Sequence, residues 1–246
     1  MDKFHDSAGV PWEGRQFSAN SFADDDGSTP EIVAKALAKE NFSLEKLHEA
    51  LINSRVLIPL LAQLGESELG THGKVVDKSA ELSIVAVATP DGQSAIPAFT
   101  SVGHMKIWKG DARPVPIETS RVALAAIAEG HTRVVLNPGT DSIALRRPFL
   151  AALAQQVPWM PPHKNSRVLA LVEIARSKLE QIENFGLLDA DPAGTLRQAE
   201  LMIQLTVRAG LNSSQLSDLL YQFSQSLQSE EFLQLVDSVS LKVIPS

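Results

Sequence analysis

The sequence TPDGQSAIPAFTS occupies residues 89–101 and follows directly on an almost wholly apolar run, Leu82–Thr89. Proline fixes the φ angle of the first turn residue and glycine accepts a positive φ, so residues 89–92 predict a tight turn. The apolar run is rich in β-branched residues, which is typical of a central strand covered on both faces. We therefore expect a β-hairpin in which Gln93–Phe99 returns beside that strand.

Short helices and strands are expected to follow the hairpin. The most regular helical pattern, RVALAAIAEG at residues 121–130, is capped by Thr119 or Ser120 and closed by its glycine. The other elements expected between the hairpin and residue 157 are a helix from Thr100 or Ser101 through Trp108, a proline-marked crossing at Asp111–Pro116 into a strand, a strand at Arg133–Leu136, a turn at Asn137–Gly139, a strand at Ile143–Leu145 and a helix over Phe149–Ala154.

Two helices and a strand are expected before the hairpin. Ser28 or Thr29 can cap the first helix, and Ser43 can cap the second. The run VLIPLLAQL at residues 56–64 predicts a buried strand. Because proline cannot donate to a strand ladder, Pro59 argues that this strand lies at a sheet edge or carries a bulge.

The sequence PWMPPHKNS at residues 158–166 predicts a linker, because its prolines cannot continue a helix or a ladder. The patterns beyond it predict a small α+β sandwich built from a helix over 168–182, strands at 185–188 and 201–207, a helix capped by Ser213 or Ser214, and a strand at 236–244. The expected architecture is α/β (α+β): a flexible arm at 1–28, an N-terminal domain at 29–157 with a mixed sheet flanked by helices, the linker at 158–166, and the smaller C-terminal domain at 167–246.

Length and composition fit two modest folded domains: 246 residues, 44% hydrophobic and 21% charged. The chain has no cysteine, which excludes disulfides, thiolate zinc sites, iron–sulfur clusters and a cysteine nucleophile. No apolar run is long enough for a membrane span or a signal peptide, so we expect a cytoplasmic protein without a membrane partner. The net charge of −7 argues against nucleic-acid binding, since Arg146 and Arg147 form an isolated pair rather than a basic stripe.

Several of these segments resemble the SseB-like family, which is named for enhanced serine sensitivity. The resemblance covers most of residues 54–162, and a weaker similarity in layout extends to the family's second domain. No catalytic residue is carried over from the family, so the resemblance implies a fold and leaves the activity open. The segments that carry it are TPDGQSAIPAFTS at 89–101, ARPVPIETSRVALAAIAEG at 112–130, RVVLNPG at 133–139 and PWMPP at 158–162, with AELMIQLTVRAGLNSSQLSDLLYQF from residue 199 in the second domain.

Few residues are arranged for chemistry. The six histidines stand singly, and no two are spaced to place metal ligands on one helical face. Glu66, Glu68, His72 and Asp77 share the polar segment 65–80, which we interpret as a solvated loop rather than a cation site. No G-x-S-x-G elbow, Walker A loop or G-x-G-x-x-G turn is present. The sequence therefore predicts no catalytic residue, no metal and no cofactor.

Three residues are candidates for contacts with a partner protein: Trp108, Trp159 and Arg113. Both tryptophans lie near prolines, and rigid aromatic surface of this kind suits a partner-binding groove. The alternative is that the tryptophans plug domain ends or the seam between domains, since tryptophan is usually well buried. The last expected strand, 236–244, could form a homodimer through a sheet edge, or Lys242 on it could guard against such pairing.

The sequence predicts an ordinary hydrophobic core and shows no grouped nucleophile and base, no set of metal ligands and no phosphate-binding loop. This combination favours a non-catalytic protein-interaction or ligand-binding module. The alternative is a small-molecule sensor or enzyme whose site lies between the domains, built from residues such as Arg113, Arg121, His131 and Asp141. The first interpretation assumes that polar side chains serve to end helices, shape turns and keep the chain dissolved. Three or more acidic, basic or imidazole groups that converge in an enclosed cavity would contradict this assumption.

Overall fold

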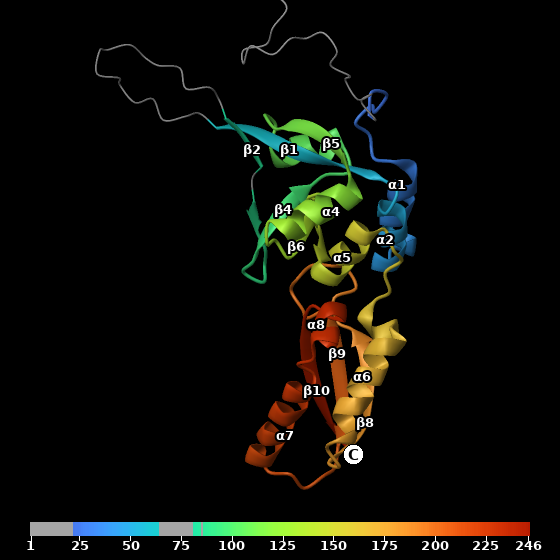
Figure 1. The fold of residues 1–246 in the computed structure, drawn as a ribbon, viewed down its shortest axis with the longest axis vertical. Coiled ribbons are helices and arrows are strands. Elements are labelled where there is room, and N and C mark those ends of the chain that lie inside the picture. Colours follow the sequence, from blue (N-terminus) through green and yellow to red (C-terminus); the bar gives the residue numbers. More distant parts are fainter. Residues whose placement is uncertain (1–21, 64–80, 85) are drawn as a thin grey trace, which may run out of the picture.

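The computed structural model describes residues 22–63, 81–84 and 86–246, which form two lobes (Figure 1). We call residues 22–155 the N-terminal lobe and residues 166–246 the C-terminal lobe. Each lobe has its own buried hydrophobic cluster and its own sheets and helices, so the α+β fold is confirmed. The domain boundaries drawn from the sequence stay a prediction.

The N-terminal lobe contains the helices expected from the sequence. Ser43 and Ser101 cap two of them, each accepting the backbone N–H group of the residue three positions on. The helices of this lobe are α1 (Glu31–Leu37), the 3-10 turn η1 (Lys39–Asn41), α2 (Leu44–Leu51), α3 (Val102–Trp108), α4 (Thr119–Ala128) and α5 (Arg147–Gln155).

The hydroxyl caps expected at the starts of α1 and α4 are wrong. Thr29 donates to Thr100 Oγ1 at 3.1 Å, and Thr119 donates to the carbonyl of Ser54 at 2.8 Å. Neither helix has a side-chain cap bond, and Ser120 lies inside α4. Tertiary hydrogen bonds therefore use hydroxyl groups that the local sequence assigns to caps.

The first sheet of this lobe is antiparallel, and its middle strand contains a proline. Its order is β2 (Glu81–Ile84), β1 (Arg55–Gln63), β5 (Arg113–Glu118). Since β1 lies between two strands and pairs with β5 without a register shift, the edge position or bulge expected from Pro59 is wrong. The proline-marked crossing expected at 111–116 is also shorter than predicted, because β5 already begins at Arg113.

Pro59 is accommodated because the ladder requires no N–H donor at this position. Leu57 exchanges backbone hydrogen bonds with Phe99, on the side of β1 away from β5. N–H directions alternate along a strand, so the nitrogen of Pro59 points to the same side as that of Leu57. On that side the pairing with β2 begins only at Leu60, opposite Ile84.

The second sheet contains the hairpin. Gly92 takes a φ of +78°, and the backbone N–H of Thr89 donates to Gln93, which confirms the turn. The expectation of one central strand over 82–89 is wrong, because that run divides between β2 and β3, at the edges of two different sheets. The second sheet has the order β3 (Val87–Ala88), β4 (Ser94–Ala98), β6 (Arg133–Leu136), β7 (Ile143–Arg146), with β4 and β6 parallel.

The two faces of this sheet have different neighbours. One face packs on α1, α2, α4 and α5 and forms the main core, which includes Ile96, Val134 and Leu145. The other face carries Ala95, Val135 and Ala144, and the residue that covers them is Leu196 of the C-terminal lobe. The helix-free face is therefore the face on which the second lobe rests.

In the C-terminal lobe, three helices cover one face of a three-stranded sheet of order β10-β9-β8 (Figure 1). The alternation expected along 201–207 is confirmed. Two expectations are wrong: the first helix ends before residue 182, and Asn212 rather than a serine caps α7. The helix α8 was not predicted from the sequence. The elements are η2 (Pro162–Lys164) between the lobes, then α6 (Ser166–Ser177), β8 (Ile182–Asp189), β9 (Leu201–Val207), α7 (Ser213–Ser226), α8 (Glu230–Leu235) and β10 (Val239–Pro245), which is parallel to β9.

Two sequence expectations fall partly or wholly outside the described residues. The segment 65–80, with Glu66, Glu68, His72 and Asp77, lies outside them, as do residues 1–21 of the expected arm. Residues 22–28 of the arm are described, and there Asp25 pairs with the buried guanidinium of Arg55. The homodimer through β10 stays a prediction, although β10 does lie at a sheet edge.

One buried residue of the main core is polar. His48 on α2 is 1% exposed, with its ring 4.8 Å from that of Phe149 and 6.2 Å from that of Trp159. Neither ring nitrogen has a hydrogen-bond partner in the described part of the chain. Burial lowers the pKa of His48 to about 4. The ring is therefore neutral at physiological pH and contributes packing alone.

We expect His48→Leu to stabilise the protein, most strongly in acid. At pH 8 it removes two unsatisfied polar atoms, a gain of about 1–3 kcal/mol. Because the folded pKa lies below the unfolded value of 6.5, wild type loses stability as the pH falls below 6.5, by about 2 kcal/mol at pH 5. Urea unfolding at both pH values measures this, with His48→Gln as a non-titrating polar control. Equal pH dependence in wild type and His48→Leu would contradict it.

Candidate functional site: the junction between the lobes

Two buried arginines lie side by side on the helix-free face of the second sheet. Arg133 on β6 and Arg146 on β7 are direct cross-strand partners. They alternate with the core-facing residues of both strands and are only 3% and 5% exposed. Like charges in this arrangement destabilise a sheet, so both guanidinium groups require carboxylates from elsewhere.

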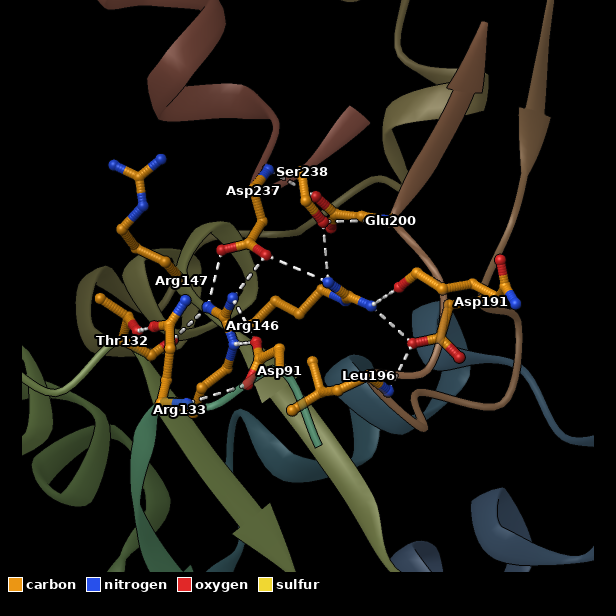
Figure 2. Close-up of polar contacts among 12 residues, drawn as sticks. Asp91, Thr132, Arg133, Arg146, Arg147, Asp191, Leu196, Glu200, Asp237 and Ser238 are labelled. Carbon is orange, nitrogen blue, oxygen red and sulfur yellow. Dashed lines mark hydrogen bonds and ion pairs between the residues drawn. The ribbon is translucent and has the colours of Figure 1, made fainter. Parts of the chain in front are cut away.

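Asp237, between α8 and β10, binds both arginines (Figure 2). Its Oδ1 accepts from Arg133 Nη1 at 2.7 Å, and its Oδ2 accepts from Arg133 Nη2 at 2.8 Å and from Arg146 Nη1 at 3.1 Å. Asp91, in the hairpin turn, accepts from Arg133 Nε at 3.1 Å. A single carboxylate of the C-terminal lobe thus bridges the two cations of the N-terminal lobe.

Asp191 connects Arg146 to the β8–β9 loop, residues 190–200. Its Oδ2 accepts from Arg146 Nη2 at 2.6 Å and from the backbone of Leu196 at 2.9 Å. Its Oδ1 accepts from the backbone and hydroxyl of Thr195, at 2.8 and 2.7 Å. Burial alone would raise the pKa of Asp191, but these hydrogen bonds hold it below its ordinary value. The carboxylate of Asp191 therefore fixes both the shape of the loop and the position of the loop relative to Arg146.

The loop lies against the outer edge of β7. The carbonyl of Gly194 accepts from the backbone N–H of Ala144 at 2.7 Å. Gly194 has a φ of +63°, and a Cβ there would lie 3.1 Å from Ile143 Cγ2 and 3.2 Å from the carbonyl oxygen of Ala144. Leu196 also has a positive φ, +59°, a conformation that costs a non-glycine residue about 1–2 kcal/mol. Burial of its side chain and the hydrogen bond that its backbone N–H donates to Asp191 offset that cost.

Glu200 is the fourth carboxyl group of the junction. Its Oε2 accepts from the backbone N–H of Asp237 at 2.7 Å, and its own N–H donates to Ser238 Oγ at 3.0 Å. Burial raises the pKa of Glu200 to about 7, and the negative charge of Asp237 acts in the same direction. Glu200 therefore changes protonation near neutral pH, inside the contact between the lobes.

A cavity of about 520 Å³ lies beside the β8–β9 loop and is lined by both lobes. The C-terminal lobe contributes Ala193 and Thr195. The N-terminal lobe contributes α1, the chain after it, α3 and the turn that follows β6. The remaining lining residues are the apolar Ala34, Leu37, Phe42 and Ile143 and the polar Thr29, Lys39, His104, Asn137, Asp141 and Ser142.

The two tryptophans proposed as interaction candidates each pack on a core. The ring of Trp108 lies 5.3 Å from that of Phe99 and covers a small cluster between α3 and β1. The ring of Trp159 lies 5.0 Å from that of Phe149 and lines a second hollow, of about 510 Å³, between α5 and α8. Arg113 is exposed at the start of β5. Whether any of the three contacts a partner stays a prediction.

The residues suggested for a site between the domains do not come together. Arg121 is paired with Glu118 on the surface, and His131 lies near Ser94 and Glu129. Asp141 does line the cavity, at 3.9 Å from Lys39. Within the described residues, no contact joins any two of Arg113, Arg121, His131 and Asp141.

The charged residues that do converge were not predicted from the sequence. The assumption that polar side chains serve only caps, turns and solubility is wrong at the junction, where Arg146 is buried beside Arg133. The groups are buried against one another rather than spread around a cavity. One signal was available. Arg133 and Val135 are two residues apart on the same strand, so their side chains point to the same face of the sheet. If both faces of that strand are buried, Arg133 must be buried as well.

Residues 31–152 match the family described as the SseB protein N-terminal domain. Through this segment the chain belongs to the SseB family. The match ends within α5, so Arg133 and Arg146 lie in the SseB segment while Asp191, Glu200 and Asp237 lie beyond it. No curated protein and no solved structure shows a significant match to the chain.

Two further findings concern the described part of this SseB-family protein. None of its helices has both the length and the apolar composition that a bilayer crossing requires. No group of three or more histidine, aspartate or glutamate side chains is placed to hold a metal ion there.

Arg146→Met should destabilise the protein by about 3–5 kcal/mol, because it leaves Asp191 and Asp237 buried with fewer partners. The matched control is Arg147→Met at the neighbouring arginine, whose bond to the carbonyl of Leu233 is exposed; it should cost below about 1 kcal/mol. Urea unfolding measures both. Similar losses in the two variants would contradict a specific role for Arg146.

Glu200→Gln should change the pH dependence of stability. The folded pKa of Glu200 is raised, so its contribution is fully present below pH 4.5 and is lost as the pH rises through about 7. Wild type should therefore lose about 3 kcal/mol between pH 4.5 and pH 8 from this group, and the variant should not. Glutamine keeps an oxygen for the N–H of Asp237. Parallel curves for the two proteins from pH 4.5 to pH 8 would refute this.

Proposed function

We propose that this SseB-family protein is a non-catalytic ligand-binding module that holds a small molecule in the cavity between its lobes. The observation that carries the proposal is that both lobes build the cavity, through Ala193 and Thr195 on one side and α1 on the other. The proposed site lies between the lobes, as in the sensor alternative, but of the four residues named for that alternative it keeps only Asp141.

The size and lining of the cavity support ligand binding. Sites for small molecules usually enclose about 300–1,000 Å³, are mainly apolar, and hold a few polar groups that orient the ligand. The volume of about 520 Å³ and the mixture of apolar and polar lining residues meet this description. The cysteine-free composition agrees with a cytoplasmic location, which is part of the proposal.

The rigidity of the wall is a second support. Thr195 is held by two hydrogen bonds to Asp191, which is itself bound to Arg146. A binding wall fixed before the ligand arrives loses less entropy on binding. A ligand that touches both lobes would in turn strengthen their contact, as expected of a sensor.

The nearest arrangement to a catalytic pair is structural. Ser101 Oγ lies 2.8 Å from His104 Nδ1, but the same oxygen accepts the backbone N–H of His104 as the cap of α3. No carboxylate contacts the ring in the described part of the chain. Without a group to orient the histidine as a base, the pair lacks the arrangement that activates a nucleophile.

A metabolite library screened by thermal shift tests the proposal. A ligand at a hundredfold excess over its Kd should raise Tm by about 5–10 °C. Ala34→Trp fills the cavity from the exposed side of α1 and should abolish the shift. Ala170→Trp, at an exposed position on α6 that does not line the cavity, is the matched control and should keep it. Ligand shifts that survive Ala34→Trp would refute the proposal.

A further inference from the structure

The hydrogen-bond pattern of the cavity wall shows which ligand groups it can receive, an inference that rests on the proposed function. The three hydroxyl groups of the lining already donate their protons to the protein. Thr29 donates to Thr100, Ser142 donates to the carbonyl of Asn137, and Thr195 donates to Asp191. The hydroxyl protons are therefore not free for a ligand.

His104 presents one free donor. Ser101 Oγ accepts the backbone N–H of His104 at 3.2 Å, and the nearest acceptor for its own proton is His104 Nδ1, at 2.8 Å. The proton of Thr100 goes to Asn137 Oδ1. We therefore assign Nδ1 as the acceptor from Ser101, which places the proton of the neutral ring on Nε2. Nε2 has no partner within the described ranges, and the half-buried ring lines the cavity.

Asn137 supplies a second donor from deeper in the wall. Its Oδ1 accepts from the backbone N–H of Thr100 at 2.9 Å, which fixes the orientation of the amide. Its Nδ2 gives one hydrogen to Thr100 Oγ1 at 3.1 Å. The second hydrogen has no acceptor in the described part of the chain, although Asn137 is only 3% exposed. A buried amide with an unused N–H gains from a ligand acceptor.

The cations and anions at the cavity nearly cancel. Lys39 and Asp141 lie 3.9 Å apart with side chains 88% and 90% exposed, so water screens both charges. Ligand recognition inside the cavity therefore depends on two hydrogen-bond donors, His104 Nε2 and Asn137 Nδ2. They lie beside the apolar surface of Leu37, Phe42 and Ile143.

We propose that the cavity binds an apolar monocarboxylate, with its carboxylate on His104 and Asn137 and its hydrocarbon part on the apolar wall. Hydrogen bonds from N–H groups to an ionised carboxylate are about twice as strong as bonds to a neutral carbonyl. An ammonium head would meet N–H groups and lose its hydration without replacement. The two donors thus select the charge and the polarity of the ligand head.

Three probes with the same aromatic body and different heads test this: phenylacetate, phenylacetamide and 2-phenylethylamine, titrated calorimetrically into the full chain near neutral pH. Phenylacetate should bind about tenfold or more tightly than 2-phenylethylamine, with phenylacetamide between them. His104→Leu should weaken phenylacetate about tenfold and leave 2-phenylethylamine nearly unchanged. His104→Gln, which retains an N–H donor, should recover part of the loss. Unliganded thermal unfolding of both variants shows that the fold is intact.

The outcomes separate this inference from the proposed function. If 2-phenylethylamine binds as tightly as phenylacetate, or if no probe binds while library compounds do, the inference is wrong and ligand binding stands. If Ala34→Trp weakens neither the probes nor any library ligand, the proposed function fails as well. Loss of phenylacetate binding in both Ala34→Trp and His104→Leu, with recovery in His104→Gln, supports both.

Discussion

The relation between the two lobes depends on the contact of Arg133 and Arg146 with Asp237. Two guanidinium groups on adjacent strands repel each other, and apolar side chains alone cannot satisfy the charges of a sheet face that carries them. The C-terminal lobe resolves this by bringing carboxylates to both. Because Asp191 and Asp237 belong to the C-terminal lobe, and only Asp91 belongs to the lobe of the arginines, the network has its full set of partners only when the lobes are docked.

The cavity is a product of the same docking. Asp191 pairs with Arg146 and, through its other hydrogen bonds, shapes the loop that contains Thr195. Gly194 lets that loop adopt a positive φ and approach the edge of β7 more closely than a Cβ would permit without a small shift of its neighbours. Changes in the protonation of Glu200, beside Asp237, therefore act on the contact that positions one wall of the cavity.

The sequence predicts the individual helices, strands and turns of this protein better than it predicts which elements pack or pair with one another. Turn chemistry located the hairpin at Gly92, and strand alternation located β9, because both signals reside in consecutive residues. The apolar run at 82–89 was misassigned because its break between two sheets is decided by partners distant in the chain. Pro59 was misassigned because a proline in a middle strand depends on where the neighbouring ladder begins. The cavity and the carboxylates around Arg146 join segments separated by tens of residues, so no local pattern could reveal them.

The charged face of the second sheet also bears on how the protein is made. Arg133 precedes Asp237 by 104 residues and Arg146 precedes Asp191 by 45, so the ribosome completes the N-terminal sheet before the carboxylates of the C-terminal lobe exist, while Asp91 alone is present as a counter-charge for Arg133. An apolar face left bare for that interval would favour aggregation of the nascent chain. A face that carries two guanidinium groups instead stays hydrated until the second lobe arrives, and the burial of these charges becomes a late step of assembly.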